Sequence, residues 1–189
     1  GAFCIAMRIK GETPEEMAGF LDATHARLNQ VNTGQAPTVV LPSYNGARKL
    51  PVLTPLLALL LAREGVAVVV HGTATEDARV SSQAVFNELG TVASGHAPQV
   101  NVGEVVFVPT GMLHAGLERL LAVRRVVGLR NPGHSLVKLM NPCDSESGSA
   151  LVVSSYTHPE YLQSMSATFA LTGQHALLLR GTEGEPVAD

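Results

Sequence analysis

Residues 38–90 decide the fold of this chain and read TVVLPSYNGARKLPVLTPLLALLLAREGVAVVVHGTATEDARVSSQAVFNELG. Two apolar strand candidates in this stretch, residues 39–41 and residues 66–70, each run directly into a polar loop that contains glycine. Parallel strands release their loops at the same carboxyl edge of a sheet, and open α/β sheets bind small molecules at that edge. We therefore expect the ligand site where these two strands end.

Short apolar runs continue to alternate with helix-length segments on the carboxyl-terminal side of this stretch. Runs of four to six branched aliphatic residues between turn signals are typical of buried parallel strands. The pattern predicts an α/β protein with a mostly parallel sheet covered by helices on both faces. The strands are predicted at residues 39–41, 66–70, 105–108, 150–154 and 176–179, and the helices at residues 53–63, 82–89, 115–127 and 159–171, with a helical turn near residues 135–139.

The amino-terminal residues have a different character. Residues 2–9 read as the end of an apolar helix, and Thr13-Pro14-Glu15-Glu16 has the capping-box pattern that begins a second helix, which we expect to end near residue 28. A polar linker follows at residues 30–36. We expect residues 1–33 to be the end of a helical domain and residues 34–189 to be an α/β domain truncated on its carboxyl-terminal side. The chain thus reads as a fragment of a longer protein.

Composition limits the class of protein. The chain has 189 residues, of which 46% are hydrophobic and 15% charged, so it can bury a sizeable core as one domain, or as one domain and part of another. Its formal net charge of -3 means that binding to nucleic acid would need a local basic cluster or a partner subunit. Cys4 and Cys143 form no metal-ligand spacing, and no apolar run is long enough to cross a bilayer. We expect a soluble cytoplasmic protein.

The loop at residues 42–49 is the first candidate site. Asn45 and Gly46 free backbone N–H groups, Tyr44 offers an aromatic face, and Arg48 and Lys49 supply two cations. Such a loop suits an anion or a stacked base. A plain polar turn, in which Asn45 and Gly46 adopt positive φ, explains the same residues.

His71 and Gly72 end the second strand and form the next candidate. Glycine permits close backbone approach, and an imidazole can donate to a ligand oxygen. A histidine in a loop is also commonly solvated or acts as a cap, so the position beside the first loop is what favours a ligand role.

Two charged pairs complete the candidates. His114 and Arg124 stand at either end of the helix predicted at residues 115–127, where an arginine fork suits a carboxylate or phosphate. A basic helix end that interacts with its own carbonyl groups is the alternative. Glu183 and Glu185 follow the last strand and suit magnesium bridged to substrate phosphates, whereas a charged, frayed terminus explains them equally simply.

These residues, in this order, resemble the anthranilate phosphoribosyltransferase family over nearly the whole chain. The segment GAFCIAMRIKGETPEEMAGF, residues 1–20, is similar to the helical domain of the family, and the rest is similar to its α/β domain. The resemblance implies a phosphoribosyltransferase-like α/β fold after a small all-α domain, a homodimer formed through the helical domain, and Mg as cofactor. It also assigns ligand-binding positions to Thr54, His71, Gly72, Ser81, Ser82, His114 and Arg124, and metal-binding positions to Glu183 and Glu185.

One loop departs from the pattern of the family. Residues 42–46 are PSYNG where the family has Gly-Thr-Gly-Gly-Asp to cradle pyrophosphate, and a proline and a tyrosine obstruct that approach. This loop and residues 181–185, GTEGE, are similar to the divergent YbiB-like branch of the family. That resemblance implies a dimer that binds nucleic acid without sequence specificity and has lost standard phosphoribosyl-pyrophosphate chemistry, with Arg48 and Lys49 as candidate phosphate contacts.

A Mg-dependent pentosyltransferase that uses a phosphorylated pentose and another acceptor is the alternative. In that case His71, Ser43, His114 and Arg124 would bind the substrate, beside the other candidate ligand residues of the loop, Tyr44, Asn45 and Gly46. Glu183 and Glu185 would then hold the metal.

Overall fold

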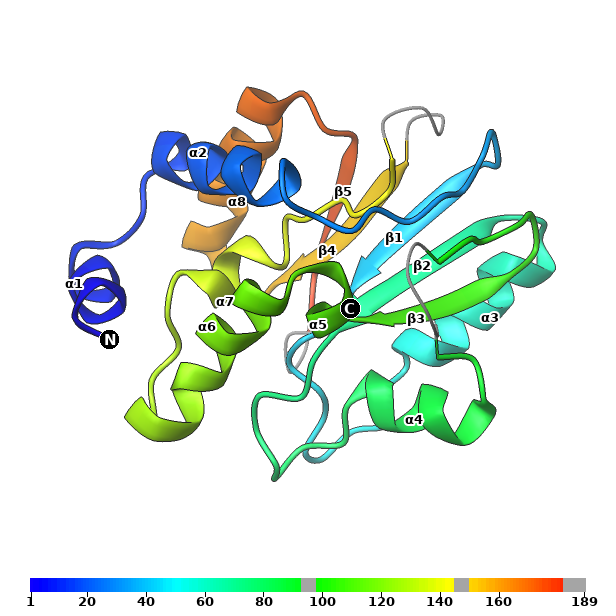
Figure 1. The fold of residues 1–189 in the computed structure, drawn as a ribbon, viewed down its shortest axis with the longest axis horizontal. Helices are drawn as coiled ribbons and strands as arrows, with labels where there is room; N and C mark the ends of the chain where they lie inside the picture. The colour runs from blue at the N-terminus through cyan, green and yellow to red at the C-terminus, as the bar shows by residue number, and fades with distance from the viewer. Residues whose placement is uncertain (93–97, 145–149, 182–189) are drawn as a thin grey trace.

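The computed structural model describes residues 1–92, 98–144 and 150–181, and within them five strands form one parallel sheet (Figure 1). Every strand pairing is parallel, as the sequence predicts. The spatial order of the strands is β3-β2-β1-β4-β5. Their bounds are β1 Thr38–Pro42, β2 Ala67–Gly72, β3 Val105–Pro109, β4 Leu151–Tyr156 and β5 Ala176–Arg180.

The strand order reverses at β1. The chain runs outward from β1 through β2 to β3, and then returns to place β4 on the other side of β1. Val39 accordingly pairs with Val68 of β2 on one side and with Leu151 of β4 on the other. Such a reversal leaves a crevice outside the carboxyl ends of the strands. The loops after β1, β2 and β4 all emerge there.

Helices cover both faces of the sheet, and the strands alternate their side chains between them. On one face, α3 (Thr54–Arg63) and α4 (Ser82–Leu89) pack with strand residues that include Leu41, Val68, Val70 and Phe107. On the other face Val40, Val69, Val108 and Val152 belong to a larger core with the remaining inner helices. These are α2 (Pro14–His25), α5 (Thr110–Leu113), α6 (Ala115–Val127), α7 (Gly133–Leu136) and α8 (Pro159–Thr172).

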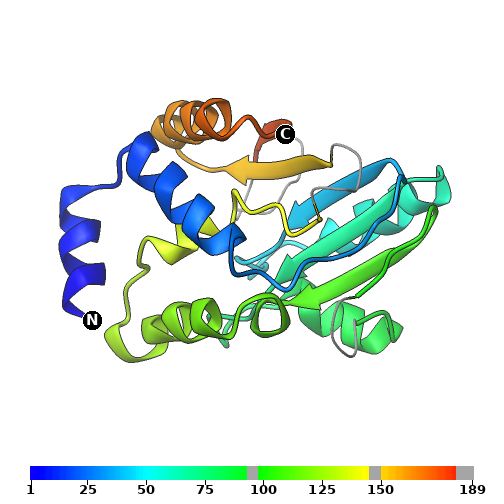
Figure 2. The same cartoon turned by 45° about the horizontal axis from the view of Figure 1, so that its top comes forward.

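The amino-terminal helices lie at one end of the molecule (Figure 2). The capping box predicted at Thr13 is present: its side chain accepts from the Glu16 N–H, and the Glu16 carboxylate accepts from the Thr13 N–H. The helix it begins, α2, packs on α8 through the same core, which contains Leu21 and Phe169. α1 (Ala2–Lys10) lies outside that contact, with Phe3 edge-on to Phe20.

The predicted elements are found with small changes of length. α4 and α6 have the predicted bounds, whereas α2 ends at His25 and the helical turn expected near residues 135–139 begins earlier, as α7. The sequence did not predict α5, a four-residue helix that contains glycine. Among the described residues, none of the helices is long and apolar enough to span a membrane.

Candidate anion-binding site

A buried hydrogen-bond network supports the carboxyl ends of β1 and β2. The Tyr44 hydroxyl lies 2.8 Å from Nδ1 of His71 and accepts a 3.0 Å hydrogen bond from Thr110 Oγ1. His71 Nε2 lies 3.3 Å from the carbonyl oxygen of Met140. Because a carbonyl only accepts, Nε2 carries the proton, and Nδ1 accepts from the tyrosine.

This network is closed to solvent. His71 has no exposed surface and Tyr44 is only 5% exposed. Burial lowers the pKa of His71 to about 3 and raises the pKa of Tyr44. His71 is therefore neutral at physiological pH, and the aromatic face that we expected Tyr44 to offer for stacking is covered. In this conformation the two side chains support the loop and do not form its surface.

The loop after β1 is buried as well. Residues 42–47 are all buried, and the N–H of Ser43 donates to the His71 carbonyl at 2.8 Å. Ala47 and Val80 exchange two backbone hydrogen bonds, and Ser43 Oγ donates to Ser82 Oγ at 2.7 Å. Gly72 is required at its position, since a Cβ atom there would lie 1.9 Å from the Ser43 carbonyl oxygen. The backbone of this loop is therefore engaged with the protein itself.

Arginine side chains gather on the outer side of this loop around one carboxylate. Glu76, in the segment after β2, accepts from Arg48, from Nε of Arg79 at 3.1 Å and from Nη2 of Arg124 at 2.5 Å. The hydrogen bond from Arg48, with those of the other arginines, lowers the pKa of Glu76 to about 2. One carboxylate thus faces three guanidinium groups.

A fourth arginine joins this group. Arg130 Nη2 donates to Oδ1 of Asn45 at 2.7 Å, and burial together with the charges of Arg124 and Arg79 lowers its pKa. We call these four residues the arginine cluster: Arg48, Arg79, Arg124 and Arg130. Guanidinium groups gathered in this way suit the oxygens of a phosphate group, which they can bind through paired hydrogen bonds.

The other predicted site residues fall in separate places. His114 is the N-cap of α6, where its Nδ1 accepts from the Leu117 N–H, so α6 holds it apart from Arg124 at its far end. Ser81 caps α4, and Thr54 is fully buried at the start of α3. Lys49 is exposed next to Arg48. Glu183 and Glu185 lie outside the described residues.

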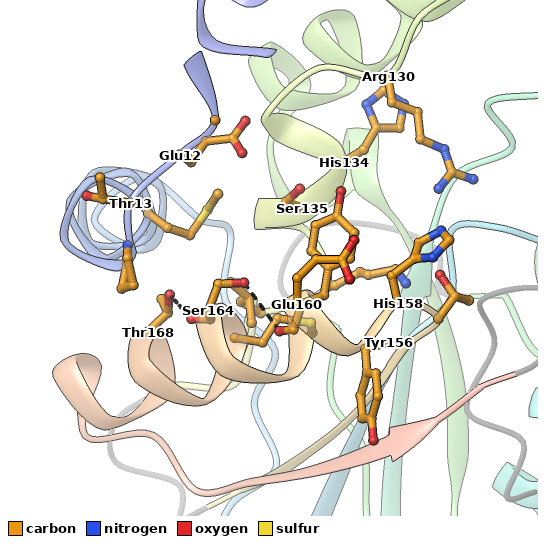
Figure 3. A pocket seen from close by; sticks show the side chains of 18 of the residues that line it. Glu12, Thr13, Arg130, His134, Ser135, Tyr156, His158, Glu160, Ser164 and Thr168 are labelled. Atoms are coloured by element: carbon orange, nitrogen blue, oxygen red, sulfur yellow. Dashed lines mark hydrogen bonds between the residues drawn. The ribbon is translucent and has the colours of Figure 1, made fainter. Parts of the chain in front are cut away.

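A pocket of about 560 Å³ opens beside the cluster, at the carboxyl end of β4 (Figure 3). We call it the β4–α8 pocket. In Figure 3, Glu12 and Thr13 stand on one side, Arg130, His134 and His158 on the other, and Ser164 and Thr168 of α8 below. Arg8, Lys138 and Tyr161 also line it. Arg130 belongs both to this pocket and to the arginine cluster.

The pocket and the carboxylate at the centre of the cluster were not predicted from the sequence. Thr157 and His158 directly follow β4 and line the pocket, so a polar loop at a strand end is the sequence signal that could have indicated it. Glu76 and Arg79 lie in a charged loop after a strand, but nothing local indicates which arginines they meet. No group of three or more His, Cys, Asp or Glu side chains suited to a metal ion is found among the residues that the structure describes.

Comparison with known proteins shows which proteins the chain is similar to. Residues 1–27 match the model of the "Glycosyl transferase family, helical bundle domain". The whole chain is 41% identical to the uncharacterized protein YbiB of Escherichia coli K12 and spans 60% of it. A stretch covering 97% of the chain is 31% identical to the anthranilate phosphoribosyltransferase of Nocardia farcinica and spans 53% of that enzyme. The chain therefore covers between half and three fifths of these relatives.

Solved structures agree on the fold. The anthranilate phosphoribosyltransferase of Thermus thermophilus superposes with a TM-score of 0.76 at 23% identity, over 97% of this chain and 56% of that enzyme. The enzyme of Saccharomyces cerevisiae in complex with PRPP and Mg gives a TM-score of 0.70 at 14% identity, over 97% of this chain and 53% of that one. With these sequence matches, the chain is a homologue of the anthranilate phosphoribosyltransferase family and of YbiB.

Proposed function

We propose that the protein to which this chain belongs binds nucleic acid without sequence specificity, through the arginine cluster. The observation that supports this most directly is the convergence of Arg48, Arg79 and Arg124 on the single carboxylate of Glu76. Guanidinium groups held at one surface bind the phosphate oxygens of a nucleic acid whatever its base sequence, because the sugar-phosphate backbone is the same at every base.

The loop after β1 favours binding over standard transferase chemistry. A pyrophosphate cradle needs backbone N–H groups that face the ligand. Here the N–H groups of Ser43 and Ala47 donate to the carbonyl groups of His71 and Val80, and the loop residues are buried. The arginine cluster lies outside that loop, so a phosphate chain can reach it without entering the loop.

Pentosyl transfer with Mg is the second candidate. The arginine cluster suits the phosphate of a pentose as well as that of a nucleic acid, and the yeast relative is solved in complex with PRPP and Mg. Assembly as a homodimer through the helical segment and a cytoplasmic location belong to either proposal as expectations.

The test titrates the full-length protein into a fluorescently labelled oligonucleotide at rising salt. Release of counterions from about three phosphates would weaken binding by more than about tenfold between about 50 and 200 mM salt. Arg48→Gln should weaken binding for all sequences alike and reduce the salt slope by about one. Arg63→Gln is the matched control, because Arg63 ends α3 at the opposite edge of the sheet and is exposed.

The same preparation separates the two candidates. Calorimetry with PRPP and Mg at millimolar concentration should give no saturable heat that Arg48→Gln removes if nucleic-acid binding is the function. An oligonucleotide affinity that does not change with salt, or that Arg48→Gln and Arg63→Gln lower equally, would contradict the proposal. Saturable PRPP binding with no oligonucleotide binding would favour the transferase.

A further inference from the structure

We propose that the β4–α8 pocket binds a nucleoside monophosphate. This goes beyond nucleic-acid binding by the arginine cluster and does not depend on it, because Arg130 is the one residue of the cluster that lines the pocket. The pocket volume of about 560 Å³ lies within the range usual for small-ligand sites.

Three cations from separate elements line the pocket. Arg8 of α1 and Arg130, which follows α6, are joined by a hydrogen bond from Arg8 Nη1 to the Arg130 carbonyl at 3.3 Å. Lys138, after α7, is fixed by donation from Nζ to the Ser155 carbonyl of β4 at 3.0 Å. Two guanidinium groups and an ammonium group on one pocket suit the dianionic phosphate of a nucleotide.

His134 adds a ring nitrogen, Nε2, that has no hydrogen-bond partner among the described residues. The residue is only 8% exposed, and its Nδ1 lies 3.2 Å from the Asn131 nitrogen and 3.3 Å from the Asn131 carbonyl oxygen. Nε2 is buried without a hydrogen-bond partner among the described residues, and it carries the proton of the neutral ring in the tautomer whose Nδ1 accepts from the Asn131 N–H. Burial, and next the charge of Arg130, lowers the pKa of His134 to about 4, so the ring stays neutral. With the proton on Nε2, a phosphate oxygen in the pocket would accept from it and offset the free-energy cost of burying this nitrogen without a partner.

Aromatic rings stand at the rim of the same pocket. Tyr161 of α8 is 44% exposed, and its ring centroid lies 6.2 Å from that of His158. An exposed ring beside cations offers a nucleobase a stacking face, since every base has one. The acidic residues Glu12 and Glu160 complete the wall and accept from the hydroxyl groups of a ribose. The pocket thus offers side chains suited to the phosphate, the sugar and the base of a nucleotide.

The experiment titrates 5′-nucleoside monophosphates into the full-length protein by calorimetry, with matched nucleosides, ribose 5-phosphate and inorganic phosphate as separate arms. We expect one saturable site per chain for the monophosphates, and affinities at least about tenfold lower for each partial ligand. Lys138→Met keeps the length of the side chain but removes its charge, and Tyr161→Leu removes the ring from an exposed position. Each should weaken the monophosphate by at least about tenfold, whereas Arg48→Gln should leave it unchanged.

The outcomes separate this site from the nucleic-acid surface. No saturable heat with any monophosphate at millimolar concentration overturns the pocket proposal, even when the protein retains oligonucleotides. Monophosphate binding that Lys138→Met and Tyr161→Leu leave intact overturns it also, because the ligand must then bind elsewhere. If monophosphates bind as expected while oligonucleotides do not bind, the proposal for the pocket is supported and the proposal of nucleic-acid binding is contradicted.

Discussion

Arg124 donates from Nη2 to a carboxylate oxygen of Glu76 at 2.5 Å and so ties the last turn of α6 to the segment after β2. The same carboxylate accepts from Arg48 and Arg79. In the absence of ligand Glu76 therefore acts as an internal counterion that holds three guanidinium groups at one place. A nucleic-acid phosphate that approaches the cluster competes with this carboxylate or shares its arginines.

Replacing Glu76 tests this relationship. Glu76→Gln removes the internal negative charge, so the affinity of the full-length protein for an oligonucleotide should rise several-fold at low salt, and the salt dependence should steepen. Fluorescence anisotropy across a salt series measures both effects. The variant should also unfold at lower denaturant concentration, because the three arginines lose their common partner.

Asp77→Asn provides the control for this change. It removes the same formal charge one residue away, but Asp77 is largely exposed and pairs with Arg125, outside the cluster. Exposed ion pairs contribute little, so we expect an effect on affinity of less than about twofold. Equal effects of the two substitutions would show that only the net charge of the protein changes the affinity, and that Glu76 does not act as the counterion of the cluster.

The buried histidines predict a loss of stability in mild acid. His71 and His134 have pKa values lowered to about 3 and about 4 from the usual 6.5, in both cases first by burial. Below pH 6.5 these two histidines therefore bind protons in the unfolded chain but stay neutral in the folded chain. The contribution of the two neutral rings to the free energy of unfolding is complete above pH 6.5. It is lost as the pH falls, by up to about 1.4 kcal/mol per pH unit for each histidine.

Urea unfolding between pH 7 and pH 5 measures this loss before the carboxylates titrate. His134→Asn keeps an acceptor for the Asn131 N–H, and should remove about half of the pH dependence. His175→Asn, at an exposed position, should leave the dependence as it is. A free energy of unfolding that is flat over this range would mean that neither ring is held neutral by the fold.

Tyr44→Phe probes the network beneath the loop. The substitution leaves Nδ1 of His71 without its donor and Thr110 Oγ1 without its acceptor in a buried place, so unfolding should become easier by about 1 to 3 kcal/mol. Tyr161→Phe makes the same chemical change at a half-exposed ring and should cost less than about 0.5 kcal/mol. Denaturant unfolding of the two variants, with an oligonucleotide titration of each, distinguishes a structural tyrosine from one that binds nucleic acid.

The sequence predicted the sheet well because its signals are local. Runs such as residues 66–70 are apolar throughout, as strands buried on both faces must be, and helix-length segments such as Ser82–Leu89 and Ala115–Val127 separate them. It also placed the loops after β1 and β2 at one edge. The short helix Thr110–Leu113 was missed because four residues with a glycine carry no helical periodicity.

The chemistry at that edge could be predicted only in part, since it depends on distant partners. Residues 42–46, PSYNG, look like a polar surface loop, but Tyr44 is buried because it reaches His71, 27 positions further along the chain. The sequence marks Arg48 as a phosphate candidate but not its partner Glu76, because Arg48 and Arg124 lie 28 and 48 positions from that carboxylate. The pocket likewise draws on α1, α7, β4 and α8, and no single segment indicates it.

Arg130 is the residue that the cluster and the β4–α8 pocket share. Its guanidinium donates to Asn45 on the side of the cluster, and the residue lines the pocket together with His134. Arg130→Gln should therefore weaken both oligonucleotides and nucleoside monophosphates, by about tenfold or more in each case. Arg48→Gln should affect the oligonucleotide alone, and Lys138→Met should affect the monophosphate far more strongly. Titration of both ligands into all three variants measures this pattern. If Arg130→Gln changes only one of the two affinities, the surfaces are independent, and the guanidinium serves the ligand whose affinity it changed.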